Sequence, residues 1–200
     1  MKILAITSSP RRNGNSETLL DRALASMKGR NIVVKKVILA NLHISPCNGC
    51  LACMKTGECI IKDDMQAVYE DLVAADTLLV ACPIYFMGLP CQLKCVIDRC
   101  QAIWARKYVL KKIQTPSPRR GEGRGEGGKD RRGAAILVCA SSSVKDMFTG
   151  AIKTLKAWFN TLDFSYKKEF LAEGLEQESA ALKDKKLLRQ AYKFGEKFTG

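Results

Sequence analysis

Four cysteines follow one another at short, regular intervals. The segment from 47 to 59 reads Cys-Asn-Gly-Cys-Leu-Ala-Cys-Met-Lys-Thr-Gly-Glu-Cys, a C-x2-C-x2-C-x5-C pattern. Spacing this short lets one glycine-bearing loop fold its sulfurs around a compact centre, and four thiolates suit a [4Fe–4S] cubane. Zinc also accepts four thiolates, but its sites usually join two separated C-x2-C pairs. We therefore predict a [4Fe–4S] cluster on Cys47, Cys50, Cys53 and Cys59, with zinc, or redox or structural thiols, as alternatives.

The other five cysteines lack this spacing. Cys82 and Cys139 continue strand-like apolar runs, and Cys100 lies on the apolar side of a helix pattern, where free cysteine behaves as a small hydrophobic residue. Cys91 and Cys95 lie near a helix start. An odd total of nine cysteines, without an export signal before the first strand pattern, argues against a disulfide framework and predicts a cytoplasmic location.

A turn rich in hydroxyl and small residues joins the first strand-like run to the first helix pattern. Residues 7–18 read Thr-Ser-Ser-Pro-Arg-Arg-Asn-Gly-Asn-Ser-Glu-Thr. Free N–H groups and the positive end of a helix dipole at such a turn attract a phosphate dianion. The alternative is an ordinary surface loop in which a serine caps the helix. The predicted phosphate-binding residues are Ser9, Arg11, Asn15, Ser16 and Thr18.

Two further loops follow later strand patterns, at what a parallel sheet would make the same edge. Residues 83–90 are apolar and aromatic, and residues 140–143 read Ala-Ser-Ser-Ser. Ligands of open α/β sheets bind in the crevice at this edge, where a flat heterocycle could lie against an aromatic ring. The alternative is that both aromatic residues fill the end of the core. The predicted ligand-binding residues are Pro83, Ile84, Tyr85, Phe86, Gly88, Ser141 and Ser142.

These segments together resemble the NADPH-dependent FMN reductase family, which has a flavodoxin fold. The resemblance rests on residues 8–20 and 83–88 and on the cysteine segment followed by Ile-Ile-Lys-Asp-Asp-Met at 60–65. More narrowly, the chain resembles the iron-sulfur flavoproteins of this family, over about residues 1–112 and 133–172. The resemblance implies FMN at the carboxyl edge of the sheet, a [4Fe–4S] cluster, and a homodimer or homotetramer that brings the cluster and flavin of neighbouring subunits together.

The elements that must position these residues alternate between strand and helix patterns. Apolar residues at i, i+3 and i+4 predict helices over about 16–27, 93–104 and 147–162. A shorter helix begins at Asp63 with a capping box to Gln66, and a charged helix covers 176–198. The alternation predicts an α/β fold, a three-layer, doubly wound, five-stranded parallel sheet of the flavodoxin type. The predicted strands are 2–7, 32–38, 77–82, 134–139 and 164–171.

One charged stretch stands outside this pattern. Residues 115–133 contain no apolar residue larger than proline, and glycine is the commonest residue. Such a composition cannot bury enough surface to fold, so we predict a disordered basic insertion at about 115–132. The net charge of the chain is +13, and residues 106–132, with ten basic and three acidic residues, carry +7 of it. The insertion departs from the family pattern.

Length and composition limit the possible classes of function. Two hundred residues, 46% hydrophobic and 26% charged, indicate one globular domain spanning 1–200 with a cysteine loop at 44–62, and no run is long enough to cross a membrane. We predict an electron-transfer flavoprotein whose donor is ferredoxin or NAD(P)H. One alternative is an NAD(P)H-dependent FMN or quinone reductase without a functional cluster. A basic nucleic-acid-binding module is disfavoured, because the insertion has no aromatic residue to stack on bases.

Overall fold

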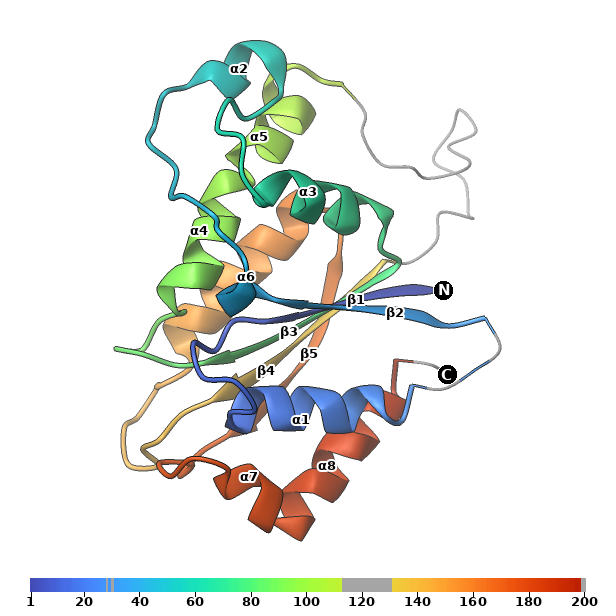
Figure 1. Cartoon of the computed structure of the whole chain (residues 1–200), viewed down its shortest axis with the longest axis vertical. Coiled ribbons are helices and arrows are strands. Elements are labelled where there is room, and N and C mark those ends of the chain that lie inside the picture. The colour runs from blue at the N-terminus through green and yellow to red at the C-terminus, as the bar shows by residue number, and fades with distance from the viewer. Residues whose placement is uncertain (28, 30, 113–130, 199–200) are drawn as a thin grey trace.

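The computed structural model describes residues 1–27, 29, 31–112 and 131–198. Five strands form one parallel sheet in the order β2-β1-β3-β4-β5. Helices cover both faces (Figure 1), which confirms the predicted three-layer, doubly wound, flavodoxin-like fold. The strands are β1 (Lys2–Thr7), β2 (Val33–Ile38), β3 (Thr77–Pro83), β4 (Arg132–Val138) and β5 (Ser165–Ala172).

The three central strands are buried on both faces. Residues of β1, β3 and β4 are almost all buried, whereas the edge strands β2 and β5 alternate with exposed positions. Strands covered on both sides read as continuous apolar runs, and this explains Leu-Leu-Val-Ala at 78–81. Lysines on β5, at 167 and 168, fall on an edge strand, where charge discourages pairing with another sheet.

Each face of the sheet has its own core. Alternate residues of β1 separate the two: Leu4 and Ile6 pack with α3 (Met65–Ala74), α4 (Cys91–Arg99) and α6 (Thr149–Thr161), whereas Ile3 and Ala5 pack with α1 and α8. On that second face lie α1 (Asn15–Leu24), α7 (Ala180–Lys183) and α8 (Lys185–Glu196). Among the described residues, no helix is both long and apolar enough to span a membrane.

Several predicted helices begin, end or break elsewhere. The 93–104 helix is α4 followed by α5 (Gln101–Trp104) and a π-helical turn (Ala105–Val109). The single helix predicted over 176–198 is wrong: α7 ends before Asp184, whose carboxylate accepts the Leu187 N–H at 2.9 Å and caps α8. Two short helices were not predicted, the 3-10 turn Leu39–Asn41 and α2 (Ala52–Thr56).

Residues 115–130 of the predicted insertion lie outside the described residues. Its last two residues are described: Arg132 begins β4, and Arg131 is a structural anchor. The Arg131 guanidinium donates to the carbonyls of Ala75, Leu162 and Leu72 at 3.0, 2.8 and 2.6 Å. It also lies 3.9 Å from the centre of the Phe164 ring. These contacts hold the start of β4 against both neighbouring connections.

Candidate functional site

The cysteine loop wraps around one cavity. The thiols of Cys47, Cys50, Cys53 and Cys59 all line a cavity of about 100 Å³, together with Ile61 and other apolar residues. The structure thus brings together the four residues predicted to be ligands. The loop stands at one end of the molecule, where Figure 1 shows α2 beside α5.

The backbone of this loop reverses at three positions with positive φ. Gly49 and Gly57 have φ of +69° and +81°, and Leu51, just before α2, has φ of +59°. Glycine adopts this left-handed conformation freely, whereas for leucine it is unfavourable. A Cβ at Gly57 would lie 2.6 Å from Cγ of Arg106, so this position also requires close approach. The glycines noted in the cysteine pattern therefore serve the turns that bring the sulfurs together.

The donor set consists of four cysteines around one cavity, and a [4Fe–4S] cluster is held by four thiolates. Burial raises the pKa of the Cys53 thiol, and the neighbouring Cys59, Cys47 and Cys50 raise it further. Within the described residues, no three His, Cys, Asp or Glu side chains are arranged to hold a single metal ion. The residue types therefore fit the cluster predicted for this loop.

A buried ion pair that the sequence analysis missed holds both ends of the cysteine loop. The Arg99 side chain is 0% exposed and its Nη1 lies 2.8 Å from Asp63 Oδ2. Arg99 also donates to the carbonyls of Ser45 at 2.9 Å and Ile61 at 3.0 Å, one on each side of the cysteines. Burial alone would raise the pKa of Asp63, but Arg99 and the N–H groups of Ser45 and Met65 lower it.

This pairing also replaces the predicted capping box. Asp63 Oδ1 accepts the Met65 N–H at 3.1 Å, but Gln66 Nε2 donates to the Ile61 carbonyl at 2.9 Å, and α3 begins only at Met65. The acidic residue that looked like a helix cap therefore belongs to the cysteine loop. A signal for Arg99 was present in the sequence, because an arginine at a position of the apolar helix face needs a buried anionic partner.

The predicted phosphate turn follows β1 directly. Ser8 N–H donates to the Ala81 carbonyl at 3.0 Å, which holds the start of the turn against β3. Ser9 is 7% exposed and its Oγ accepts the Arg11 N–H at 3.2 Å. Ser16, in the first turn of α1, is 2% exposed. Buried serine hydroxyls beside the N–H groups of a helix N-terminus fit an anion such as the FMN phosphate.

The remaining turn residues have different environments. Thr18 is half-buried, whereas the Arg11 side chain is exposed. Asn15 is engaged elsewhere: its amide donates to the carbonyls of Leu175 and Gln177 at 3.2 and 2.9 Å and accepts the Ala181 N–H at 3.0 Å. Asn15 thus ties α1 to the segment before α7.

Glu17 is a second charged residue that the sequence analysis missed. Its carboxylate is buried, accepts the Asn13 N–H at 2.8 Å and pairs with Lys36 Nζ at 2.8 Å. Burial alone would raise the pKa of Glu17, but Lys36 and the Asn13 N–H lower it below its ordinary value. The carboxylate binds the N–H of Asn13, whose φ is 55°, and so helps to fix the conformation of the turn. An acidic residue in the first turn of a predicted helix could have indicated this role in the sequence.

The aromatic loop is a tight, strained turn. Tyr85 and Gly88 exchange backbone hydrogen bonds of 3.1 and 2.9 Å, and the two residues between them, Phe86 and Met87, both have positive φ. Such turns favour Asn and Gly, so this conformation is costly for Phe-Met. Tyr85 is 45% exposed and Phe86 is fully exposed, so the alternative that both rings fill the core is wrong. Ile84, 8% exposed, takes the buried position.

The three loops lie at one edge of the sheet, as predicted. Ile84 N–H donates to the Val138 carbonyl at 2.7 Å, which joins the aromatic loop to the end of β4. There Ser141 is half-buried and Ser142 is exposed, and Ser141 Oγ lies 3.0 Å from Ser143 Oγ. Pro83 ends β3, and Gly150 at the start of α6 would bring a Cβ within 2.8 Å of the Met87 carbonyl. Close packing of α6 therefore supports the exposed turn.

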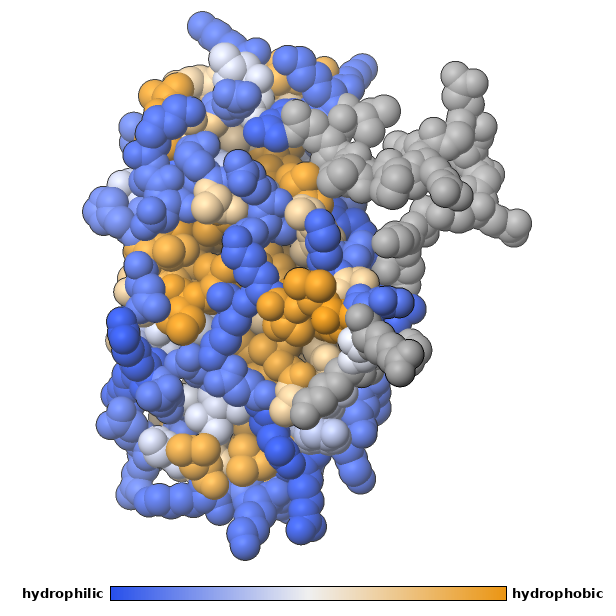
Figure 2. All heavy atoms as spheres, turned by 45° about the vertical axis from the view of Figure 1, so that its right-hand side comes forward, coloured by the Kyte–Doolittle hydropathy of each residue, from blue (hydrophilic) through white to orange (hydrophobic). Residues whose placement is uncertain are grey.

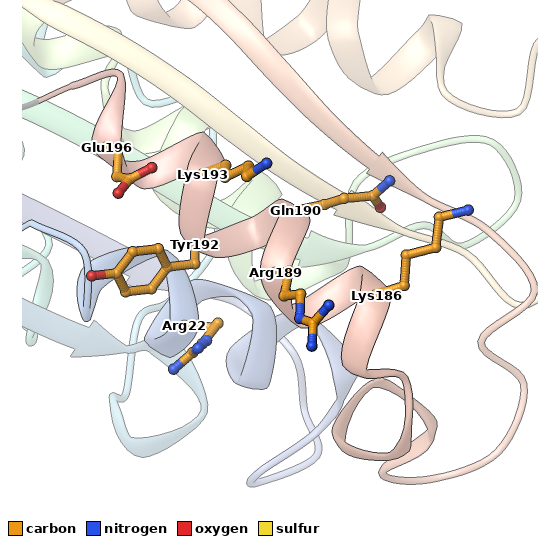
Figure 3. A pocket seen from close by; sticks show the side chains of 7 residues that line it. All are labelled: Arg22, Lys186, Arg189, Gln190, Tyr192, Lys193 and Glu196. Atoms are coloured by element: carbon orange, nitrogen blue, oxygen red, sulfur yellow. The ribbon is translucent and has the colours of Figure 1, made fainter.

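A further hollow lies away from this edge, between α1 and α8. It measures about 520 Å³ and its lining is mostly basic. Figure 3 shows Arg22 of α1 facing the Tyr192 ring, with the guanidinium carbon 4.9 Å from the ring centre. The sides of helices line it rather than loops that follow strands, and it contains none of the predicted site residues. The lining residues are Arg22, Lys186, Arg189, Gln190, Tyr192, Lys193 and Glu196.

Comparison with known proteins agrees with this geometry. The profile of the NADPH-dependent FMN reductase family matches residues 1–124, which include both the phosphate turn and the cysteine loop. The chain belongs to this family. It is 38% identical over 111 residues to an iron-sulfur flavoprotein of Methanosarcina thermophila, covering 56% of this chain and 58% of that protein. It is 35% identical over 159 residues to an iron-sulfur flavoprotein of Archaeoglobus fulgidus, and the match covers 79% of this chain and 64% of that protein.

The chain therefore spans about three fifths of the length of these relatives. Solved structures extend the likeness of the fold to the whole chain. A flavone reductase superposes with a TM-score of 0.70 at 17% identity, covering 100% of this chain and 62% of that one. An FMN-dependent NADH-azoreductase from Bacillus anthracis, solved in complex with FMN, superposes with a TM-score of 0.61 at 19% identity. This match covers 100% of this chain and 98% of that one. At these identities the likeness concerns the fold alone.

Proposed function

We propose that this protein is an electron-transfer flavoprotein, an oxidoreductase that passes electrons between a [4Fe–4S] cluster and FMN. The observation that carries the proposal is the convergence of four cysteine thiols on one cavity, in a chain of the FMN reductase family. When bound, the cluster supplies one-electron transfer, and the flavin exchanges one or two electrons. The relatives named iron-sulfur flavoproteins support the same assignment.

The residues at the carboxyl edge bind and orient the flavin. Ser9, Ser16 and Thr18 supply hydroxyl donors to the phosphate, and Arg11 neutralises part of its charge. The helix N-terminus adds N–H groups and a favourable dipole. The exposed ring of Tyr85 or Phe86 would cover one face of the isoalloxazine and shield it from water, and Ser141 and Ser142 would contact it from the loop after β4. No side chain need act as an acid or base.

Helix α4 connects the two sites. It begins at Cys91, directly after the aromatic loop, and ends at Arg99, which lines the cysteine cavity. At 1.5 Å per residue the two ends are about 12 Å apart. Figure 1 shows the aromatic loop and α2 on different sides of the molecule, with α4 between them. Within one chain the aromatic loop and the cysteine loop therefore lie at opposite ends of this helix.

We therefore propose that the working unit is a homodimer or homotetramer, in which the flavin of one subunit approaches the cluster of another. Exposed apolar residues support an interface: Tyr85, Phe86 and Met87 at the flavin edge, and Trp104 and Tyr108 beside the cysteine loop. Figure 2 shows further apolar surface across the middle of the side where the strands begin. Light scattering during gel filtration tests this, since a monomer at micromolar concentration would contradict it.

The electron donor is ferredoxin or NAD(P)H. The net charge of +13 favours an acidic protein such as ferredoxin through long-range attraction. The family profile favours the nicotinamide, which would give hydride to the flavin. Anaerobic mixing with each donor distinguishes them: ferredoxin reduces the cluster first and its rate falls with salt, whereas NADPH bleaches the flavin band first.

The experiment that tests the function is an absorption spectrum of anaerobically purified protein with iron, sulfide and flavin assays. Flavin bands on a broad brown shoulder, with about four iron and four sulfide per chain, are the expected result. Flavin with no iron would favour the second candidate, an NAD(P)H-dependent FMN or quinone reductase, since the phosphate turn and cysteine loop are structurally separate. A colourless protein containing zinc would contradict both.

A further inference from the structure

The guanidinium of Arg99 keeps one donor without a partner. Nη1 bonds to Asp63 Oδ2 and the Ser45 carbonyl, and Nη2 bonds to Asp63 Oδ1 and the Ile61 carbonyl, at 2.8 to 3.1 Å. Arginine has five N–H donors, and the fifth, Nε–H, is buried and unpaired within the described residues. A buried donor without an acceptor is unfavourable, and a further group bound beside it is one way to satisfy it.

This donor belongs to a residue that lines the four-cysteine cavity. Asp63 accepts hydrogen bonds from both Nη atoms of the guanidinium. The Nε–H is therefore the donor that remains for a group bound in the cavity. The guanidinium stays protonated in proteins, so a fixed cation stands beside the sulfurs. In other metal sites, groups in this position orient the ligands and tune the metal.

We propose that Arg99 is a positioning residue of the cluster site, which donates its Nε–H to a sulfur of the [4Fe–4S] cluster and raises its reduction potential. The inference rests on the proposed function, since it requires that the four cysteines hold a cluster. Reduction adds one electron to a centre that already carries negative charge, and no bond forms or breaks. An N–H donor and a fixed cation stabilise the reduced form more than the oxidised form, and hydrogen bonds to sulfur are among the factors that set cluster potentials.

Arg99 also fixes the frame of the loop. The two carbonyls that it binds, of Ser45 and Ile61, lie two residues before the first ligand cysteine and two after the last. Tyr69 OH in turn donates to the Arg99 carbonyl at 2.7 Å and holds the end of α4 in place. The donor therefore stands on a rigid support, and it needs no rearrangement when the cluster gains an electron.

Arg99→Lys tests the proposal, because lysine keeps a cation opposite Asp63 and removes Nε–H. Arg106→Lys is the matched control: Arg106 Nε donates to the Gly57 carbonyl of the same loop at 2.7 Å, but Arg106 does not line the cavity. The measurement is a dithionite titration followed by electron paramagnetic resonance, at known iron content. We expect the equilibrium constant for one-electron reduction to fall about tenfold in Arg99→Lys, a shift of about 59 mV to lower potential.

The control should keep the wild-type potential. A wild-type potential in Arg99→Lys, with four iron per chain, would overturn the proposal, and so would an equal shift in Arg106→Lys. If Arg99→Lys cannot hold iron, Arg99→Met with Asp63→Asn removes both charges together and avoids an unpaired buried carboxylate. Its potential should be at least as low as that expected for Arg99→Lys.

A measurement on the unaltered side chain makes the test independent of folding. Protein labelled with 15N-arginine should show a 15N hyperfine coupling to the reduced cluster, and Arg106→Lys should keep it. Absence of this coupling in iron-loaded wild-type protein would contradict the inference while leaving the cluster itself established. Wild-type protein that takes up no iron after anaerobic reconstitution would instead overturn the proposed function, and the inference with it.

Discussion

The cysteine loop and the carboxyl edge of the sheet are held by different kinds of contact. The edge consists of short turns, each fixed by backbone hydrogen bonds to a neighbouring strand, such as Ser8 to Ala81 and Ile84 to Val138. Side chains hold the cysteine loop instead: Arg99, 36 residues from its partner Asp63, binds both ends of it, and Arg106 donates to the Gly57 carbonyl. A site built on strand ends should tolerate the loss of one side chain better than a loop that depends on a buried ion pair.

This difference predicts that the cluster can be removed without the flavin. Cys50→Ser should lose essentially all cluster iron, because serine cannot replace a thiolate in the cavity, whereas FMN should stay bound by other loops. Electron transfer from a one-electron donor should then fail, while slow reduction of the flavin by dithionite persists. Iron, sulfide and flavin assays on the same preparation provide the measurement. Full iron in Cys50→Ser, or equal loss of flavin, would contradict the separation of the sites.

The next largest effect should come from the buried ion pair. Asp63→Ala leaves the Arg99 cation buried without its partner, and we expect the free energy of unfolding to fall by about 3–5 kcal/mol. Asp71→Ala is the matched control, since Asp71 pairs with Lys35 at 2.6 Å on the surface and should change stability by about 0–1 kcal/mol. Urea unfolding at neutral pH measures both. Equal losses of stability in the two variants would mean that the cysteine loop does not depend on the Arg99–Asp63 pair.

At the carboxyl edge a single substitution should weaken binding rather than folding. Ser16→Ala or Arg11→Ala removes a charge-assisted contact to the phosphate, with an expected loss of about 1.5–3 kcal/mol in FMN affinity. Ser26→Ala is a suitable control, because the Ser26 hydroxyl donates to Ala23 at the far end of α1. Flavin titration followed by fluorescence gives the affinities. If both Ser16→Ala and Arg11→Ala bind FMN as tightly as wild type, the phosphate lies elsewhere.

The same comparison explains what could be predicted from the sequence. The strands, the doubly wound parallel sheet and the grouping of four cysteines in one loop could be predicted, because apolar runs and short cysteine spacing depend on neighbouring residues. The Arg99–Asp63 pair joins residues far apart in the chain, and only the packing of α4 beside the loop reveals it. The partners of Asn15 could not be predicted for a related reason, because residues 175–181 are distant from it in sequence. The break at Asp184 is a local exception, since a capping aspartate outweighed a continuous helical pattern.

The stability of the protein should also depend modestly on pH, because of Glu17 in the turn at the carboxyl edge. The pKa of Glu17 is lowered in the folded protein, so its carboxylate stabilises the fold at any pH above the ordinary pKa of 4.5. This contribution is lost as the pH falls through the lowered pKa. Glu17→Gln should therefore be less stable than wild type at neutral pH, and the difference should shrink in acid. We expect a smaller effect than that of Asp63→Ala, since Lys36 is 25% exposed. A difference that stays constant from pH 7 to 3 would contradict this.

The smallest effect should come from the cysteines of the core. Burial raises the pKa of Cys82 and of Cys100 to about 12, and neither cysteine lines the four-cysteine cavity. Cys100→Ala should cost about 1 kcal/mol of stability, as for other small core truncations, with iron content unchanged. Iodoacetamide should likewise fail to label Cys82 or Cys100 in the native protein and should label both in urea. Iron loss in Cys100→Ala, which lies next to Arg99 in the chain, would show that the cluster site reaches further into α4 than the four-cysteine cavity indicates.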